Sequence, residues 1–221
     1  MGNILKSDSY KFDYQNISNG LDLLADINTD SIAVAFFDPQ YRGILDKMKF
    51  GNEGNYRQNS RCALTQMTEE TIVMFINDID RVLKPSGYLF LWVDKFHLCQ
   101  GIESWVTNTS LNIVDMITWN KMQLGMGFRA RHKSEFLVVL QKSPKKAKCS
   151  WFDHSIPDVW EEKVAKNHPH SKPIELQRRL ILATTTEDDV VLDPCAGGYS
   201  VLSACKLANR TFIGCDISFT T

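Results

Sequence analysis

The sequence predicts a single α/β domain in which helices cover both faces of a mostly parallel sheet. Nearly continuous apolar runs of strand length, such as residues 31–37 (SIAVAFF) and 88–93 (YLFLWV), are typical of strands buried on both faces. These runs alternate with segments whose apolar residues recur at helical spacing. The length of 221 residues and the apolar content of 43% suit one ordinary domain spanning 1–221.

Each element is predicted from its own pattern and its own start and stop signals. Thr68 caps the first clear helix, the KPSG sequence at 84–87 ends it, and Pro173 opens a later helix. The expected strands lie at 31–37, 88–93, 111–119, 136–140, 190–192 and 211–215. Helices are expected at 97–108, from Pro173 to about residue 185, and at 200–208, and the proline-containing segment 142–170 is expected to be irregular.

Composition excludes several classes of protein. No apolar run approaches the roughly 20 residues that span a bilayer, and residues 1–5 are too short and polar for a secretory signal. The six cysteines form no CxxC pair and several lie in apolar stretches, so we expect reduced core thiols in a cytoplasmic protein. His168, His170, His154 and Cys149 lack the paired spacing of a metal site, and no metal is expected. With a net charge of −1, nucleic-acid binding would need local basic patches.

Unusual residues follow the first predicted strand, at Asp38-Pro39-Gln40-Tyr41. Ligands of open α/β sheets bind beyond the carboxyl ends of strands. Pro39 restricts both the direction in which the Asp38 carboxylate leaves the strand and the direction of its own carbonyl. Two fixed acceptors followed by an aromatic ring suit a planar base with an exocyclic NH2 group. An ordinary strand exit marked by Asp-Pro is the alternative.

A second candidate site lies at 190–200 (VVLDPCAGGYS) and 211–216 (TFIGCD). A strand, a glycine turn, a helix, a strand and a terminal acid make a nucleoside-binding half-fold. Gly197 and Gly198 allow close approach of the backbone to a ligand, and Asp216 can accept hydrogen bonds from ribose hydroxyls. The loop is not GxGxxG, and Tyr199 is expected to crowd a pyrophosphate, so the pattern indicates an adenosine without phosphates.

Together the two sites resemble the β-class S-adenosylmethionine-dependent DNA amino-methyltransferases, which modify adenine N6 or cytosine N4. Residues 31–41 are similar to the family's strand and DPPY motif, and 81–94 to the strand behind it. Residues 120–140, with Arg129, Arg131, His132 and Glu135, resemble the segment linking two late strands, and 168–182 the helix motif before the cofactor loop. The base motif precedes the cofactor motif, so the resemblance implies a Rossmann-like methyltransferase fold with circularly permuted motif order.

The resemblance also implies roles for particular residues. It places Asp38, Pro39 and Tyr41 at the target base, where Asp38 and the Pro39 carbonyl accept the two amino hydrogens and Tyr41 stacks on the flipped-out ring. It implies S-adenosylmethionine as the cofactor, bound by Ser171, Lys172, Asp193, Pro194, Cys195, Ala196, Gly197, Gly198 and Asp216. Asp22 (or Asn19) is expected near the adenine, and Lys172 and residues 193–198 are expected at the methionine end.

Two stretches are expected to contact nucleic acid. Residues 121–148 hold eight Lys/Arg against one acid, and 42–61 hold five against two. We expect 42–67 to be a mobile DNA-contacting loop and 142–170 to be a minimal target-recognition region, although the 142–148 lysines also suit a plain solvated face. The candidate contact residues are Arg42, Arg57, Arg61, Arg129, Arg131 and His132.

The leading hypothesis is a DNA adenine-N6 methyltransferase of restriction-modification type, from a bacterial or phage-like source, acting on double-stranded DNA. DPPY-like motifs that begin with Asp favour adenine in this family. The alternatives are a cytosine-N4 or RNA amino-methyltransferase and a degenerate module that binds nucleic acid or a partner without turnover. Gln40 in place of the second proline and the five residues after Asp216 are the departures that support the module. A homodimer or partner subunit is expected to cover the adenosine.

Overall fold

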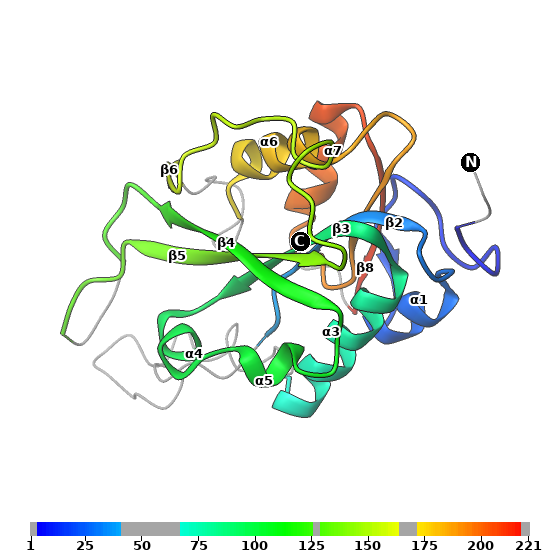
Figure 1. The fold of residues 1–221 in the computed structure, drawn as a ribbon, viewed down its shortest axis with the longest axis horizontal. Helices are drawn as coiled ribbons and strands as arrows, with labels where there is room; N and C mark the ends of the chain where they lie inside the picture. The colour runs from blue at the N-terminus through cyan, green and yellow to red at the C-terminus, as the bar shows by residue number, and fades with distance from the viewer. Residues whose placement is uncertain (1–3, 41–66, 126–128, 164–171, 218–221) are drawn as a thin grey trace.

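The fold is known from a computed structural model, in which residues 4–40, 67–125, 129–163 and 172–217 are described (Figure 1). The strands are β1 (Asn16–Ile17), β2 (Ile32–Phe37), β3 (Leu83–Val93), β4 (Leu111–Asn120), β5 (Ser134–Lys142), β6 (Val159–Glu161), β7 (Val190–Asp193) and β8 (Thr211–Asp216). The helices are α1 (Gly20–Asp26), α3 (Glu69–Val82), α4 (Lys95–Gln100), α5 (Glu103–Val106), α6 (Ile174–Thr184) and α7 (Ser200–Ala208).

The described strands form one sheet in the order β1-β8-β7-β2-β3-β5-β4-β6. Strands β1, β8, β7, β2 and β3 run parallel to one another, β5 lies antiparallel between β3 and β4, and β6 pairs parallel with β4. The carboxyl ends of β2, β3, β7 and β8 therefore lie along one side of the sheet, which we call the carboxyl edge. The opposite side is called the amino edge. This topology confirms the predicted Rossmann-like α/β fold with a mostly parallel sheet.

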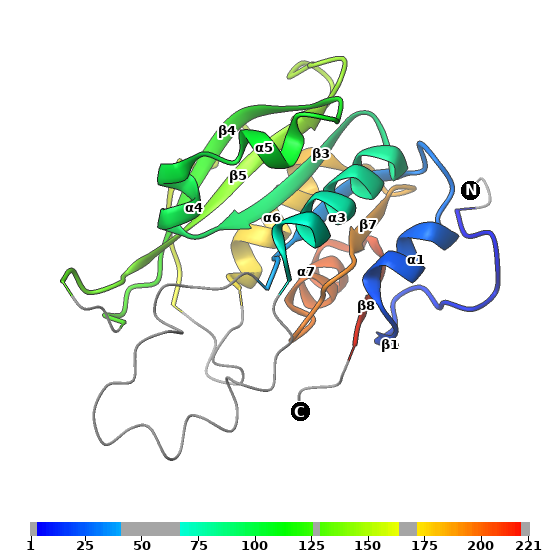
Figure 2. The same cartoon turned by 90° about the horizontal axis from the view of Figure 1, so that it is seen from below.

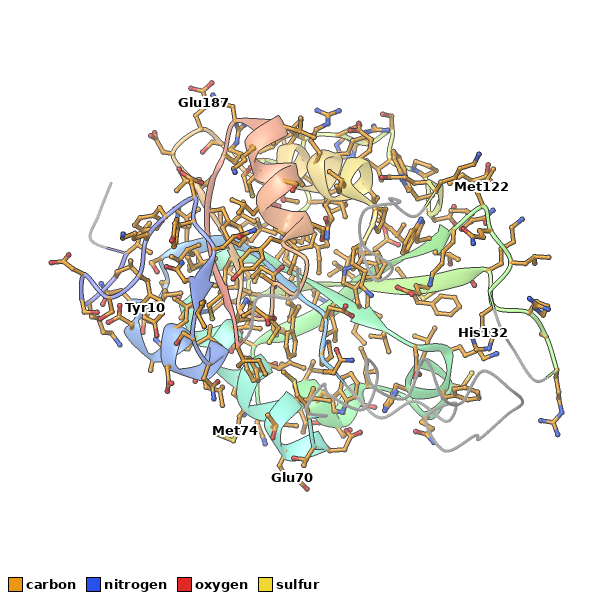
Figure 3. The ribbon with its side chains drawn as sticks, turned by 180° about the vertical axis from the view of Figure 1, so that it is seen from behind. Tyr10, Glu70, Met74, Met122, His132 and Glu187 are labelled. Atoms are coloured by element: carbon orange, nitrogen blue, oxygen red, sulfur yellow. The ribbon has the colours of Figure 1, made fainter. Side chains whose placement is uncertain are left out.

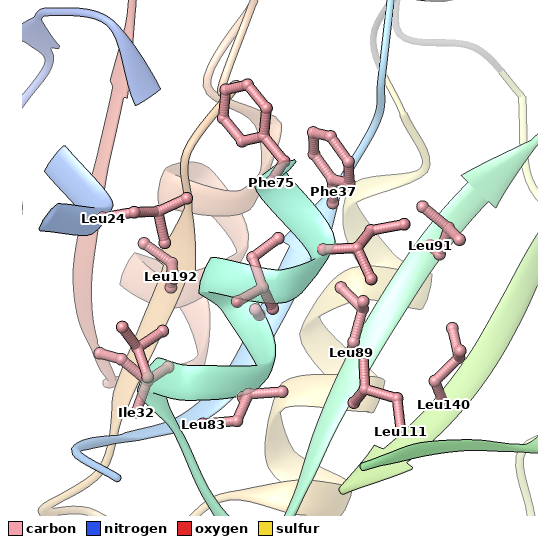
Figure 4. Packing of buried hydrophobic residues seen from close by; sticks show 14 of the residues in the cluster. Leu24, Ile32, Phe37, Phe75, Leu83, Leu89, Leu91, Leu111, Leu140 and Leu192 are labelled. Carbon is pink, nitrogen blue, oxygen red and sulfur yellow. The ribbon is translucent and has the colours of Figure 1, made fainter. Parts of the chain in front are cut away.

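Helices cover both faces of the sheet, as predicted (Figures 1 and 2). The core on one face joins α1, α3 and α5 to alternate strand residues such as Phe37 and Leu91, and Figure 4 shows part of this packing. The core on the other face joins α6 and α7 to the intervening residues, such as Phe36 and Phe90. Every residue of β2 is buried, which explains its continuous apolar sequence. This two-sided packing holds the strand ends in fixed positions.

The segment before β2 adds two elements that the sequence patterns do not predict. Strand β1 has two residues and α1 has seven, which is too short for a clear periodicity. Tertiary contacts hold both, since β1 pairs with the end of β8, and Leu23 and Leu24 of α1 are buried in the core. The Asn19 side chain also caps α1 by accepting a hydrogen bond from the Leu21 amide. This segment therefore lies beside the carboxyl edge.

Four other expectations need correction. The segment 142–170 is not wholly irregular, because it contains β6. The KPSG sequence ends α3 as expected but already belongs to β3, and the single helix expected at 97–108 is two short helices separated at Gly101, whose φ is +91°. The expectation of core thiols is confirmed for Cys205 and Cys215, but Cys99 and Cys149 are exposed. Across the described ranges, no helix is long and apolar enough to cross a membrane.

Candidate active site

Acidic residues stand where the central strands end. Asp38 follows β2, Asp193 is the last residue of β7, and Asp216 is the last residue of β8. The register brings them together, since β2 lies beside β7 and Asp193 is paired with Gly214 two residues before Asp216. The two segments selected from the sequence thus meet at the carboxyl edge. This is the position at which open α/β sheets bind their ligands.

A line of alternating charges ends at Asp38. The Lys172 ammonium lies 2.9 Å from Asp38 Oδ2 and 2.9 Å from Glu135 Oε2. The other carboxylate oxygen of Glu135 accepts a hydrogen bond from Lys121 Nζ. The Lys172 ammonium also lies 5.0 Å from the centre of the Trp92 ring, within the range of a cation–π contact. We call these four charged residues, Lys121, Glu135, Lys172 and Asp38, the ion network.

The ion network shifts the pKa values of its two middle members, Glu135 and Lys172. Burial alone would raise the pKa of Glu135, but the charges of Lys172 and Lys121 outweigh burial and lower it to about 2. Burial alone would lower the pKa of Lys172, but Asp38 and Glu135 raise it above its ordinary range. Both groups are therefore charged at neutral pH. Lys172 was expected at the methionine end of a cofactor, and the structure places it against the predicted base-site acid.

The glycine turn after β7 is built on hydrogen bonds to the strand ends. The Cys195 amide donates to Asp193 Oδ1 over 3.1 Å, and the Gly197 amide donates to Asp216 Oδ2 over 3.0 Å. Gly197 has a φ of +48°, and a Cβ added there would meet no atom within 4 Å. A side chain at this position would project into open space beside two acids, so glycine keeps the backbone accessible to a ligand.

Asp193 is buried among like charges. Burial, together with the charges of Asp38 and Asp216, raises the pKa of its carboxyl to about 8, although the Cys195 amide opposes the shift. Burial and the charges of Asp193, Asp216 and Asp22 likewise raise the pKa of the Cys215 thiol to about 12. At neutral pH the Asp193 carboxyl therefore keeps its proton, and the negative charge beside the turn comes from Asp38 and Asp216. Such an environment fits a ligand that carries positive charge, as a sulfonium and an ammonium do.

The beginning of α1 packs against this turn. A Cβ added at Gly20 would lie 2.2 Å from the Pro194 carbonyl oxygen, so the helix approaches more closely than any other residue would permit. Asp22, a candidate for contact with an adenine, is exposed in the first turn of α1, while Asn19 caps that helix. Both candidates therefore stand beside the turn.

Tyr199 does not crowd the glycine turn, and that expectation is wrong. Its side chain is buried, its hydroxyl donates to the Asn16 carbonyl over 2.8 Å, and its ring makes an edge contact with Phe212. Its own backbone is left-handed, with a φ of +55°, and this conformation turns the side chain into the core. The space over the turn is therefore not limited by this residue.

The candidate DNA contacts on the connection between β4 and β5 lie at the carboxyl edge. The Lys121 amide donates to the Lys133 carbonyl and the Gly125 amide to the His132 carbonyl, so the described parts of this connection form a hairpin. Arg129 and Arg131 are exposed, and Figure 3 shows Met122 and His132 on this side of the molecule. Burial and the charges of Lys95 and Lys121 lower the pKa of His132. The hairpin thus presents arginines beside the ion network.

The lysines of residues 142–148 lie at the other side of the sheet from the hairpin, which favours the alternative that they form a plain solvated face. Strand β5 runs antiparallel to β3 and carries its end to the amino edge, where the Pro144 and Lys146 carbonyls accept hydrogen bonds from Ser86 and Tyr88. Lys142 is paired with Asp30 and also donates to two backbone carbonyls. The first part of the expected target-recognition region is therefore remote from Asp38.

Several predicted site residues lie outside the described residues, namely Tyr41, Arg42, Arg57, Arg61 and Ser171, together with most of the expected loop at 42–67 and with His168 and His170. Pro39 is buried directly after Asp38, and Gln40 is exposed. In the part of the chain that is described, no three His, Cys, Asp or Glu side chains are placed to hold a metal ion.

The fold and the paired strand-end sites define an amino-methyltransferase of the kind the motifs resemble. The profile of the DNA methylase family matches residues 32–220, and the chain belongs to this family of S-adenosylmethionine-dependent DNA methyltransferases.

Particular relatives agree. The chain is 60% identical over 207 residues to the Type II methyltransferase M.HhaII of Haemophilus parahaemolyticus, covering 93% of this chain and 91% of that protein. Its fold is similar to the crystal structure of the M1.HpyAVI–SAM complex (TM-score 0.65, 18% identity, 91% of both chains). It is also similar to the cytosine-N4-specific PvuII DNA methyltransferase (TM-score 0.69, 14% identity, 92% of this chain and 81% of that one).

Proposed function

We propose that this DNA methyltransferase acts on the exocyclic N6 of adenine in duplex DNA, with Asp38 and the Pro39 carbonyl as the acceptors for the amino hydrogens. One observation carries the proposal. Ala35 of β2 is paired with Leu192 of β7, so Asp38 and Asp193 lie at neighbouring strand ends on the carboxyl edge, and the charge of Asp38 helps to raise the pKa of the Asp193 carboxyl. The base-site acid and the first acid of the glycine turn therefore face a common space, in which a methyl donor and an acceptor nitrogen can be aligned.

The proposed work of Asp38 is to prepare the attacking nitrogen. The lone pair of an aromatic amine is delocalised into the ring, which makes it a poor nucleophile. Hydrogen bonds from both amino hydrogens to Asp38 and to the Pro39 carbonyl favour a pyramidal nitrogen whose lone pair can attack. Lys172 Nζ lies 2.9 Å from Asp38 Oδ2 and keeps this carboxylate in its orientation. Most of the remaining rate enhancement comes from in-line alignment of the reacting atoms.

The residues of the glycine turn fit the cofactor. Asp216 and the backbone of residues 194–198 would hold its ribose and methionine parts, with Asp193 and Asp22 as further contacts. When bound, S-adenosylmethionine supplies a methyl group activated by the positive charge on sulfur. The negative environment around Asp193 supports the binding of that positive charge.

The target must leave the duplex to reach Asp38. Flipping one base costs roughly a few kcal/mol, and stacking on Tyr41 would return about 1–3 kcal/mol of this cost. Arg129, Arg131 and His132 on the hairpin are the proposed DNA contacts among the described residues. A homodimer or partner subunit stays a prediction of the sequence, which sedimentation of the protein with and without DNA would test.

The fold does not select the target base, since a cytosine-N4 enzyme has a similar fold. The proposal of adenine therefore depends on Asp38, the first residue of the DPPY-like motif at 38–41. The test is methyl transfer from labelled S-adenosylmethionine to unmethylated duplex DNA, followed by nucleoside analysis. Wild type is compared with Asp38→Ala and with Asp115→Ala, an exposed acid on β4 that serves as the control.

We expect label in N6-methyladenine with wild type and the control, and none with Asp38→Ala. Label in N4-methylcytosine would show that cytosine, and not adenine, is the target base. If DNA stays unlabelled, RNA is supplied in its place, and label there would show that RNA is the substrate. Cofactor binding without transfer to either nucleic acid would favour a binding module.

A further inference from the structure

Glu135 is a partly exposed acid with no assigned role, and it lies in the middle of the ion network. It lies near the start of β5, where its backbone is paired with Trp119 of β4 and its neighbour Phe136 is paired with Val93 of β3. Its position is therefore set by the sheet. Lys172, in contrast, lies just before α6 and reaches the network through a long side chain with four rotatable bonds.

The contacts of Glu135 are divided between two cations. Oε2 accepts a hydrogen bond from Lys172 over 2.9 Å, and Oε1 accepts one from Lys121. Lys172 in turn contacts Asp38 Oδ2, so its ammonium is shared between two carboxylates. The side chain of Lys172 is 15% exposed, and that of Asp38 is 41% exposed. The network thus runs from Lys121, at the start of the hairpin, through the little-exposed Lys172 to the more exposed Asp38.

Buried pairs are often replaceable by apolar residues at little cost in stability, so they are weak indicators of a stabilising role. Here the charges alternate in a line of four, and the outermost is the proposed acceptor for the target amine. Without the charge of Glu135, Asp38 would be the one carboxylate of the ion network left to balance the charge of Lys172. This would weaken Asp38 as an acceptor for another donor.

We propose that Glu135 is a positioning residue for methyl transfer, which acts through Lys172 to set the orientation and the acceptor strength of the Asp38 carboxylate. The proposal rests on the proposed role of Asp38 at the target base. Lys121 completes the arrangement by neutralising the second oxygen of Glu135. Because Lys121 is also the first residue of the β4–β5 hairpin, the same network joins the proposed DNA contacts to the reaction centre.

The test is Glu135→Gln, which keeps the shape of the side chain and removes its charge. We expect kcat for methyl transfer to fall by about tenfold or more, with KM for DNA and Kd for S-adenosylmethionine changed by less than about threefold. Glu135→Asp, which retains a carboxylate, should recover part of the lost kcat. The matched control is Glu175→Gln, which removes a carboxylate paired with Arg178 on the nearby helix α6 and should leave kcat unchanged.

Folding is measured on each variant by circular dichroism and urea unfolding. If Glu135→Gln does not fold, the double variant Glu135→Gln/Lys121→Met replaces it, since it removes one charge of each sign and leaves the Lys172–Asp38 pair. The double variant should show the same loss of kcat.

A wild-type kcat in Glu135→Gln, or a loss that only follows the unfolded fraction or the weakened cofactor binding, would overturn the proposal. Failure of the single and the double variant to fold would also overturn it, by assigning Glu135 to stability. Asp38→Ala is assayed in parallel. If Asp38→Ala is inactive while Glu135→Gln is normal, only the role of Glu135 fails. If Asp38→Ala is active, the assignment of the base site fails as well.

Discussion

Lys172 Nζ and Asp38 Oδ2 lie 2.9 Å apart, so a residue just before α6 is tied to the residue that follows β2. The family resemblance associates Lys172 with the methionine end of the cofactor. Its contacts with Asp38 and Glu135 favour a place at the boundary between the base and the cofactor. A cation there orients the acid without being consumed by the reaction.

Removal of the Lys172 ammonium should lower the free energy of unfolding. Lys172→Met leaves Asp38 and Glu135 near each other without their shared partner, so we expect a loss of about 1.5–3 kcal/mol in the free energy of unfolding. Urea unfolding measures it, and Lys145→Met, an exposed lysine at the amino edge, is the control. An unchanged urea midpoint in Lys172→Met would show that the contact contributes nothing to stability.

The buried carboxyl of Asp193 should make stability depend on pH. Its pKa is raised from 3.8 to about 8, first by burial and then by the charges of Asp38 and Asp216. Between these values the folded state retains a proton that the unfolded state has lost, so the free energy of unfolding falls as pH rises from about 4 to about 8.

Asp193→Asn cannot titrate and should remove this part of the slope. Urea unfolding of both proteins at pH 5 and pH 8 measures the effect. Parallel slopes for wild type and Asp193→Asn would contradict the raised pKa.

Replacement of Gly20 should mainly reduce stability, whereas replacement of Gly197 should mainly reduce cofactor binding. Gly20→Ala places a methyl group against the Pro194 carbonyl and the Phe75 ring, and we expect it to cost about 1–3 kcal/mol in stability. Gly197→Ala meets no neighbouring atom and costs only the strain of a left-handed backbone, about 1–2 kcal/mol.

If Gly197 contacts the cofactor as proposed, Gly197→Ala should mainly weaken S-adenosylmethionine binding. Unfolding midpoints and cofactor titration calorimetry separate the two effects. Equal cofactor affinity in Gly197→Ala and wild type would argue against a close approach of the ligand at that turn.

The two basic regions should differ in their effect on DNA. Arg129→Gln and Arg131→Gln at the carboxyl edge should weaken DNA binding and reduce the slope of log K against log salt by about 0.9 for each lost phosphate contact. Lys148→Gln at the amino edge should change neither quantity. Fluorescence anisotropy over a range of salt concentrations measures both, and a larger effect of Lys148→Gln would place the DNA on the opposite side of the sheet.

Much of the fold could be predicted because its central strands are buried on both faces. Continuous apolar runs identify β2 and β7, and the predicted bounds of α7 agree with the structure. Thr68 caps α3 by accepting a hydrogen bond from the Thr71 amide, as its position before Glu69 and Glu70 indicates. Helix α1 was missed because its position depends on the fit of Gly20 against Pro194, which no local pattern contains.

The sequence by itself determined the strand ends, and with them Asp38, Asp193 and Asp216 as candidates, because each of these apolar runs ends at its first charged residue. Only the tertiary structure decided which charges are partners. The antiparallel insertion of β5 brings Glu135 to the carboxyl edge beside Lys172 and carries residues 142–148 to the amino edge. Neighbours in the sequence are thereby separated by the length of a strand, and distant residues are joined, because ion pairs depend on distance in space.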